Sequence, residues 1–221
     1  MCIRDRIYIN VVPGTYREQV VINVPYITLQ KQPNSQGEVK LTWYYGTNTL
    51  YDSCDESGYY NPDVIDGGVT KNAPKDWGPA LVVKENGDNF ACEGLYLENS
   101  FNEYYTQEEL NEYMAPAEGS FDRGAWLNEQ LNNGVDDETI NGWIQSRSPI
   151  IKDTKPSLRE RAAAINTKAD RIVFKNCTIM SKQDTMGINN DRIYFENCKI
   201  GGTVDYICGS ATAVFLSLIH I

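Results

Sequence analysis

Short apolar runs, each followed by turn-forming residues, recur along the chain and predict a series of β-strands. The runs are rich in β-branched and aromatic residues, and we expect strands at 7–12, 20–22, 27–29, 80–83, 89–92 and 95–100. Residues 13–16 are expected to turn the chain. Residues 31–80 are rich in Gly, Asn, Asp, Pro and Tyr and are expected to form long irregular loops.

A 21-residue repeat in the C-terminal part predicts how these strands are arranged. Asp170-Arg171 recurs as Asp191-Arg192, Phe174 as Phe195, Asn176-Cys177 as Asn197-Cys198, and Ile179 as Ile200. We therefore expect equivalent strands at 171–180 and 192–200, with the asparagines at tight turns. Such a repeat predicts an all-β parallel β-helix with one turn per copy. The intervals leave no room for the crossover helices of a doubly wound α/β fold.

The stretch from 101 to 155 interrupts this pattern. Residues 108–114 and 139–144 have helical spacing, so we expect a helical insertion at about 101–155. The insertion has 11 acidic and 4 basic residues, whereas 157–215 has 6 acidic and 8 basic ones. The mildly basic repeats suit an anionic ligand, and an ordinary solvated surface is the alternative.

Net charge and hydropathy exclude two classes of partner. The net charge is −10 and no basic cluster is dense enough to bind nucleic acid. No apolar run is long enough to cross a membrane.

Residues 1–6 and 216–221 break the pattern of the residues next to them, and we interpret them as non-native tails. Residues 7–215 then form a single partial domain.

The six cysteines do not form a metal-binding pattern. None lies in a CxxC pair and the chain has one histidine, so we expect no zinc site. Cys177 and Cys198 hold equivalent positions of the repeat, which places their backbones about 5 Å apart. This spacing allows either a disulfide or an internal ladder of small apolar side chains, and we favour the ladder.

Asp184 and Asp205 are the next members of the 21-residue series and are candidate catalytic residues. Equivalent positions of stacked strands lie roughly 4.8 Å apart, so the two carboxylates are expected to face each other. Two such carboxylates repel when both are ionised, and one pKa should rise. One protonated acid beside one carboxylate suits acid–base or nucleophilic catalysis, and the amide of Gln183 can donate to a developing oxyanion. Aspartates that only hydrogen-bond in β-helix turns are the alternative.

Three ordered motifs resemble the pectinesterase (pectin methylesterase) family. They are Gly14-Thr15-Tyr16-Arg17-Glu18, Gln183-Asp184-Thr185 and GTVDYICGSATAVF at 202–215, where the family has GxYxE, QDT and GTVDFIFGxATAVF. The resemblance covers most of the chain outside the 31–80 loops and the insertion. It implies a right-handed parallel β-helix of the pectin lyase-like type that removes methyl esters from polygalacturonate.

The resemblance also implies roles for individual residues. Asp205 is expected to attack the ester carbonyl as nucleophile, giving an acyl-enzyme. Asp184 is expected to protonate the departing methanol and then to act as base towards water, while Gln183 holds the oxyanion. The expected substrate-binding residues are Arg161, Thr185, Val204 and Tyr206. The family uses no metal or organic cofactor. We expect secretion, because the substrate is an extracellular polymer, and we expect a monomer.

The sequence differs from the family pattern at several positions. Arg161 stands where the family has a second oxyanion glutamine, and Cys208 replaces an aromatic residue. The family's later arginine, which orients the nucleophile, would lie beyond Phe215, and its opening strand and capping helix would precede Ile7. A β-helix cut at both ends exposes unpaired strands, so we expect these residues alone to be poorly soluble and inactive.

Two alternatives remain open at this stage. A β-helix glycosidase or lyase acting on the same polymer would also suit paired carboxylates. A non-enzymatic carbohydrate-binding β-helix would instead stack sugars on exposed tyrosines. The candidate tyrosines are Tyr44, Tyr45, Tyr59, Tyr60, Tyr104 and Tyr105.

Overall fold

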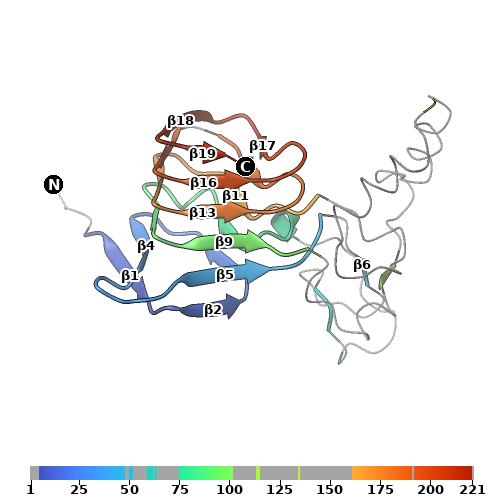
Figure 1. The fold of residues 1–221 in the computed structure, drawn as a ribbon, viewed down its shortest axis with the longest axis horizontal. Coiled ribbons are helices and arrows are strands. Elements are labelled where there is room, and N and C mark those ends of the chain that lie inside the picture. Colours follow the sequence, from blue (N-terminus) through green and yellow to red (C-terminus); the bar gives the residue numbers. More distant parts are fainter. Residues whose placement is uncertain are drawn as a thin grey trace.

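Three parallel sheets wind around one core in the computed structural model of the chain (Figure 1). The structure describes residues 5–47, 50–51, 59–61, 63, 75–101, 113–114, 134, 161–190 and 192–220; at 50, 51, 75, 113, 114 and 220 it describes the backbone alone. The predicted all-β parallel β-helix is confirmed.

Each turn of the coil contributes one strand to each sheet in sequence. Sheet A contains β1 (Ile7–Val11), β4 (Ile27–Lys31), β8 (Ala91–Glu93), β12 (Ile172–Lys175), β15 (Arg192–Glu196) and β18 (Thr212–Leu216). Sheet B, which faces the viewer in Figure 1, contains β2 (Gly14–Arg17), β5 (Val39–Trp43), β9 (Tyr96–Asn99), β13 (Thr178–Met180), β16 (Lys199–Gly201) and β19 (Ile219–His220). Sheet C contains β3 (Val20–Ile22), β7 (Leu81–Val83), β11 (Ile165–Thr167), β14 (Met186–Ile188) and β17 (Ile207–Cys208).

The 21-residue repeat corresponds to one turn of this coil. Phe174 pairs with Phe195 in sheet A, and Ile179 pairs with Ile200 in sheet B. Each expected long strand is in fact two strands, because the chain bends between sheets A and B at Asn176 and Asn197. Both asparagines have φ of 52°, a left-handed conformation that asparagine tolerates well.

Two segments predicted as turn or loop form strands instead. Residues 13–16 were expected to turn, but β2 begins at Gly14 and pairs with β5. The strand β5 lies inside the segment expected to be irregular, and its Val39 and Leu41 point into the core. In both segments the alternation of apolar and polar residues is short and is flanked by glycine and proline, so it did not predict a strand. These residues form strands because a neighbouring strand supplies hydrogen-bond partners.

The expected helical insertion is wrong at the two residues where the structure describes consecutive backbone. Tyr113–Met114 form β10, which pairs antiparallel with β6 (Leu50–Tyr51). The rest of the predicted helices at 108–114 and 139–144 lies outside the described residues. At the C-terminal end, β18 and β19 extend the ladder through 216–220, the segment interpreted as a tail.

Stacked side chains of one kind fill the core. The ring centroids of Phe174 and Phe195 lie 5.2 Å apart, and those of Phe195 and Phe215 lie 4.8 Å apart. The predicted cysteine ladder is confirmed, since Cys177 and Cys198 are buried free thiols. Cys92 extends it, with its Sγ 3.8 Å from that of Cys177. Burial raises the pKa of the Cys177 thiol well above its usual value.

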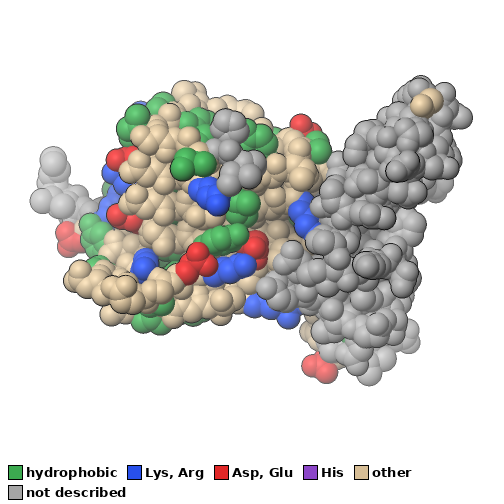
Figure 2. Space-filling model, in the orientation of Figure 1, with side chains coloured by type: hydrophobic (Ala, Val, Ile, Leu, Met, Phe, Trp, Pro, Cys, Tyr) green, Lys and Arg blue, Asp and Glu red, His purple; other side chains and the backbone are tan. Residues whose placement is uncertain are grey.

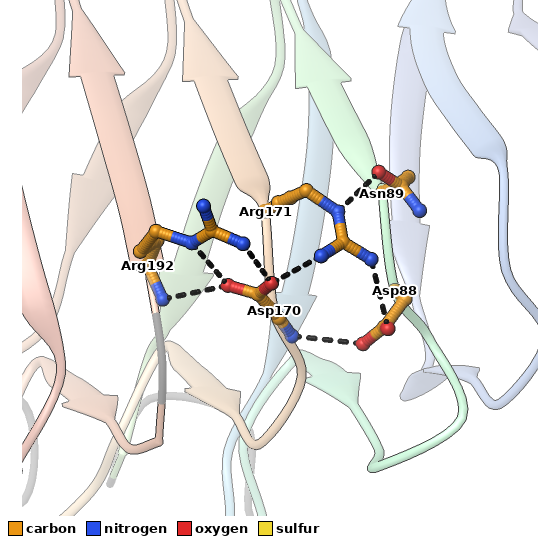
Figure 3. Close-up of polar contacts among 5 residues, drawn as sticks. All are labelled: Asp88, Asn89, Asp170, Arg171 and Arg192. Atoms are coloured by element: carbon orange, nitrogen blue, oxygen red, sulfur yellow. Dashed lines mark hydrogen bonds and ion pairs between the residues drawn. The ribbon is translucent and has the colours of Figure 1, made fainter.

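A ladder of charges covers the corner where the chain passes from sheet C to sheet A (Figure 3). Asp170 accepts hydrogen bonds from the guanidinium groups of Arg171 and Arg192. Arg171 also donates to Asp88, at 3.1 Å, and to Asn89, at 2.7 Å. Hydrogen bonding to Arg192 holds the pKa of Asp170 well below its usual value, although partial burial acts the other way.

The face formed by sheet B carries side chains of both signs, interspersed with hydrophobic ones (Figure 2). Lys40 of β5 pairs with Glu98 of β9 at 2.7 Å, and its ammonium group lies over the ring of Tyr96. The described part of this face is therefore mixed in charge. Among the described residues, no helix is long and apolar enough to cross a membrane.

Candidate functional site

The turns between sheets B and C bring Asp184 and Asp205 to equivalent positions of consecutive turns of the coil. Gln183 and Val204, the residues before them, form an isolated parallel bridge, and the backbone N–H of Asp184 donates to the Val204 carbonyl at 3.0 Å. Both aspartates have positive φ, 56° and 47°. Strained backbone of this kind is common where side chains must be aimed at a ligand.

The two carboxyl groups differ in burial. Asp184 is 5% exposed, whereas Asp205 is exposed to solvent. Burial raises the pKa of Asp184 to about 6; the Arg161 guanidinium and a hydrogen bond with Gln183 oppose this rise, and the charge of Asp205 adds to it. The Oδ1 atom of Asp184 is buried without a hydrogen-bond partner among the described residues. The pair therefore combines a carboxyl that is readily protonated with one that is open to solvent.

Arg161 lies beside the buried carboxyl rather than on it. Its Nε is 3.8 Å from Asp184 Oδ2, and its side chain is 47% exposed. The next residue, Ala162, donates its N–H to the Gln183 carbonyl at 3.0 Å, which holds this segment against the turn that carries the aspartate. At this distance the guanidinium attracts the carboxylate without a close hydrogen bond, so burial dominates the pKa.

Asn99 anchors the segment that carries Arg161, a role that sequence reasoning missed. Its amide Nδ2 donates to the carbonyls of Tyr45, at 2.8 Å, and Ala163, at 2.9 Å. Its Oδ1 accepts from the N–H of Phe101 at 3.0 Å, and the side chain is buried. Asn99 is the last residue of β9. Nothing in the sequence indicates that its side chain binds backbone groups from distant parts of the chain.

The other predicted site residues have different environments. Thr185 is fully buried, and its hydroxyl donates to the Gly201 carbonyl at 2.9 Å, so its side chain supports the turn and presents no surface to a ligand. Val204 and Tyr206 are partly exposed beside Asp205. Gly202 is required here, because a Cβ would lie 2.4 Å from the Thr185 hydroxyl oxygen.

Cys208 lies three residues after Asp205, at the end of β17, and pairs with Gly187 of β14. Its Sγ lies 3.2 Å from the Met186 carbonyl oxygen, and the side chain is partly exposed. Burial raises the pKa of this thiol, and the negative charges of Asp184 and Asp205 add to the effect. A thiol held protonated in this way is a poor nucleophile.

The tyrosines expected to be exposed do not offer sugar-stacking surfaces where the structure describes them. Tyr44 is 7% and Tyr45 1% exposed, and both belong to a buried aromatic cluster with Trp43 and Phe101. The expectation of exposure is wrong for these two because the aromatic rings pack on one another. Tyr59 and Tyr60 pack against this cluster, and Tyr104 and Tyr105 lie outside the described residues.

Among the described residues, no group of three or more acidic, Cys or His side chains is placed to hold a metal ion.

Comparison with known proteins identifies what this site resembles. Residues 140–219 match the family model named Pectinesterase. "Pectinesterase 4" of Arabidopsis thaliana is 44% identical over 70 residues, which are 31% of this chain and 12% of that protein. Relatives of this kind are matched over 10–16% of their own length.

Solved structures share the fold over almost the whole chain. A pectin methylesterase from Yersinia enterocolitica has a TM-score of 0.57 at 18% identity, covering 98% of this chain and 50% of that one. A pectin methylesterase in complex with a hexasaccharide has a TM-score of 0.52 at 22% identity, covering 96% and 45%. The chain thus spans about half the length of these structures. Residues 140–219 thus resemble the pectinesterase family, and the chain shares the fold of the solved pectin methylesterases.

Proposed function

We propose that this chain carries the catalytic aspartates of an esterase that removes methyl groups from methyl-esterified polygalacturonate. The observation that carries the proposal is a pair of carboxyl groups at equivalent positions of consecutive turns, one of them buried with its pKa raised to about 6. The family and the hexasaccharide bound to a structural neighbour support pectin as the substrate class.

In the first half of the reaction, the exposed carboxylate of Asp205 attacks the ester carbonyl carbon and forms a C–O bond. The carbonyl oxygen becomes an oxyanion, to which the Gln183 amide donates. As the intermediate collapses, the bond to the methoxy oxygen breaks and protonated Asp184 gives its proton to the leaving group. Methanol departs, and the substrate remains attached to Asp205 as an acyl-enzyme.

In the second half, Asp184 has become a carboxylate and acts as the base. It takes a proton from water, whose oxygen attacks the acyl carbon, and the bond to Asp205 breaks. The galacturonate carboxylic acid leaves, Asp205 is again a carboxylate and Asp184 is again protonated. A pKa of about 6 suits both tasks, because neither protonation state is costly near neutral pH.

Arg161 has a supporting role in this proposal. Its exposed guanidinium, 3.8 Å from Asp184, stabilises the carboxylate that forms when methanol leaves, and it can also bind a galacturonate carboxylate. No metal or organic cofactor takes part in these steps. Secretion and a monomeric state belong to the same proposal.

The experiment is an assay of pectin products by the protein expressed with its native flanking sequence. Release of methanol with an equal amount of acid is the expected result, and Asp184→Asn and Asp205→Asn should each lower the rate at least about 10³-fold while thermal melts show a folded protein. New reducing ends or an unsaturated product would instead establish a glycosidase or lyase. Unchanged methanol release by both variants would refute the proposed roles.

Residues 1–221 alone are expected to release no methanol. The chain spans about half the length of the solved pectin methylesterases, and strands at the open ends of a β-helix leave backbone groups and core side chains uncovered. Turnover by residues 7–215 close to that of the protein with its native flanking sequence would contradict this expectation.

A further inference from the structure

Arg161 has hydrogen-bonding capacity that the described residues do not use. A guanidinium group has several N–H donors, arranged to hold a carboxylate through parallel hydrogen bonds. Within the described part of the chain, the Arg161 side chain donates no hydrogen bond, and its one ion pair is with Asp184, at an Nε–Oδ2 distance of 3.8 Å. The guanidinium is therefore held only loosely by its neighbours.

Arg171 shows how a comparably exposed arginine is used within the fold. Its side chain is 46% exposed, against 47% for Arg161. Arg171 nevertheless donates to Asp88 and Asp170 on the corner between sheets C and A (Figure 3). Among the described residues, Arg161 has no carboxylate at hydrogen-bonding distance, so its donors can serve an external anion.

The backbone that carries Arg161 is held against the turn of the paired aspartates. The carbonyl of Arg161 accepts from the N–H of Thr47 at 2.8 Å, and the N–H of Ala162 donates to the Gln183 carbonyl at 3.0 Å. Gln183 directly precedes Asp184. Since these bonds fix the backbone beforehand, only side-chain freedom is lost when the guanidinium binds an anion.

The proposed reaction creates an anion beside this guanidinium. Asp184 must lie within hydrogen-bond reach of the methoxy oxygen to protonate it, and Arg161 lies next to Asp184. The ester is neutral, whereas the acid formed by its hydrolysis loses its proton to water at neutral pH and becomes a carboxylate. The charge that distinguishes product from substrate thus appears within reach of Arg161.

The paired aspartates alone would repel this product. The carboxylate of Asp205 carries the same charge as the product, and like charges repel at short range. Arg161 offsets the repulsion and can hold the product carboxylate by parallel hydrogen bonds, an advantage that the neutral ester does not share. We infer that Arg161 retains the freed galacturonate carboxylate in the site, so that demethylated polygalacturonate inhibits the enzyme. This inference rests on the proposed function, because the inhibitor is the product of ester hydrolysis.

The test is inhibition of methanol release from a methyl-esterified galacturonate hexamer by the fully demethylated hexamer, with the protein carrying its native flanking sequence. The inhibition should be competitive. Arg161→Gln should raise the inhibition constant about tenfold or more, in line with the loss of one charged hydrogen-bonded pair, and should raise KM by a smaller factor because the ester is neutral. Arg161→Lys, which keeps the charge without the planar donors, should raise the inhibition constant less.

Lys175→Gln is the matched control. It removes the same charge from a side chain that is 45% exposed on β12 of sheet A, away from the turns between sheets B and C, and should leave both constants unchanged. An unchanged inhibition constant in folded Arg161→Gln, or an equal rise in Lys175→Gln, would overturn the inference.

If the protein releases no methanol, calorimetric titration with the demethylated hexamer separates the two proposals. Binding that Arg161→Gln weakens would refute the proposed esterase and leave the binding of galacturonate by Arg161 standing. Absent binding, or binding that Arg161→Gln does not change, would overturn this inference as well.

Discussion

Replacing Asp184 by asparagine should make the folded protein more stable relative to wild type at neutral pH than at mildly acidic pH. The carboxyl ionises near pH 3.8 in an unfolded chain and near pH 6 in the folded one. Between these values the folded state binds more protons, so this group's contribution to the free energy of unfolding falls as pH rises. At 1.36 kcal/mol per pKa unit, the folded protein loses about 3 kcal/mol by pH 7.5.

Asparagine cannot ionise, so the variant lacks this loss. Because the unfolded carboxyl is already partly ionised at pH 4, the stability difference between variant and wild type should shift by about 2.5 kcal/mol in favour of the variant between pH 4 and pH 7.5. For a chain of 221 residues this corresponds to about 5–10 °C in Tm. Arg161 is half exposed and water can replace its lost partner, so it adds little to the balance.

The assay is urea unfolding followed by circular dichroism at both pH values. Asp205→Asn is the control, since this exposed side chain has no comparable burial to relieve. Removing its charge should also lower the pKa of Asp184, which a carbon-13 NMR titration of the carboxyl would detect. A difference between Asp184→Asn and wild type that is the same at pH 4 and pH 7.5 would refute the reasoning that burial governs this carboxyl.

Other substitutions test the surroundings of the site and the coil. Arg161→Gln should raise the pKa of Asp184 above about 6, measured by the same titration, because a cation that favours the carboxylate is removed. Asp170→Asn should lower Tm at pH 7, and this loss should shrink gradually as pH falls below about 4, because the carboxyl of the unfolded chain is then protonated while the folded one, held by Arg192, stays ionised to much lower pH. Asn99→Leu should cost about 3 kcal/mol or more in urea unfolding, since three carbonyls lose a buried donor. Gly209→Ala should sharply reduce the yield of folded protein, whereas Gly14→Ala should not, because only at Gly209 is φ positive and a Cβ 1.8 Å from a backbone oxygen.

The repeat made the coil and its register predictable from sequence. A 21-residue period fixes which side chains stack, so Phe174 over Phe195 and the cysteine ladder followed from it. The strand β5 did not follow, because its alternation extends over few residues and becomes strand only when β2 and β9 supply hydrogen-bond partners. Local pattern is informative where it recurs and weak where it occurs once.

The sequence by itself also placed Asp184 and Asp205 on consecutive turns, since they share the period of the repeat. Tertiary structure alone decided that Asp184 is buried, because burial depends on the segment at 161–164, which hydrogen-bonds to the residues on either side of Asp184. It likewise decided that Trp77 rests on Gly187, 110 positions later in the chain. Spacing along a repeat is a property of the chain, whereas dielectric environment and contacts between distant segments arise only on folding.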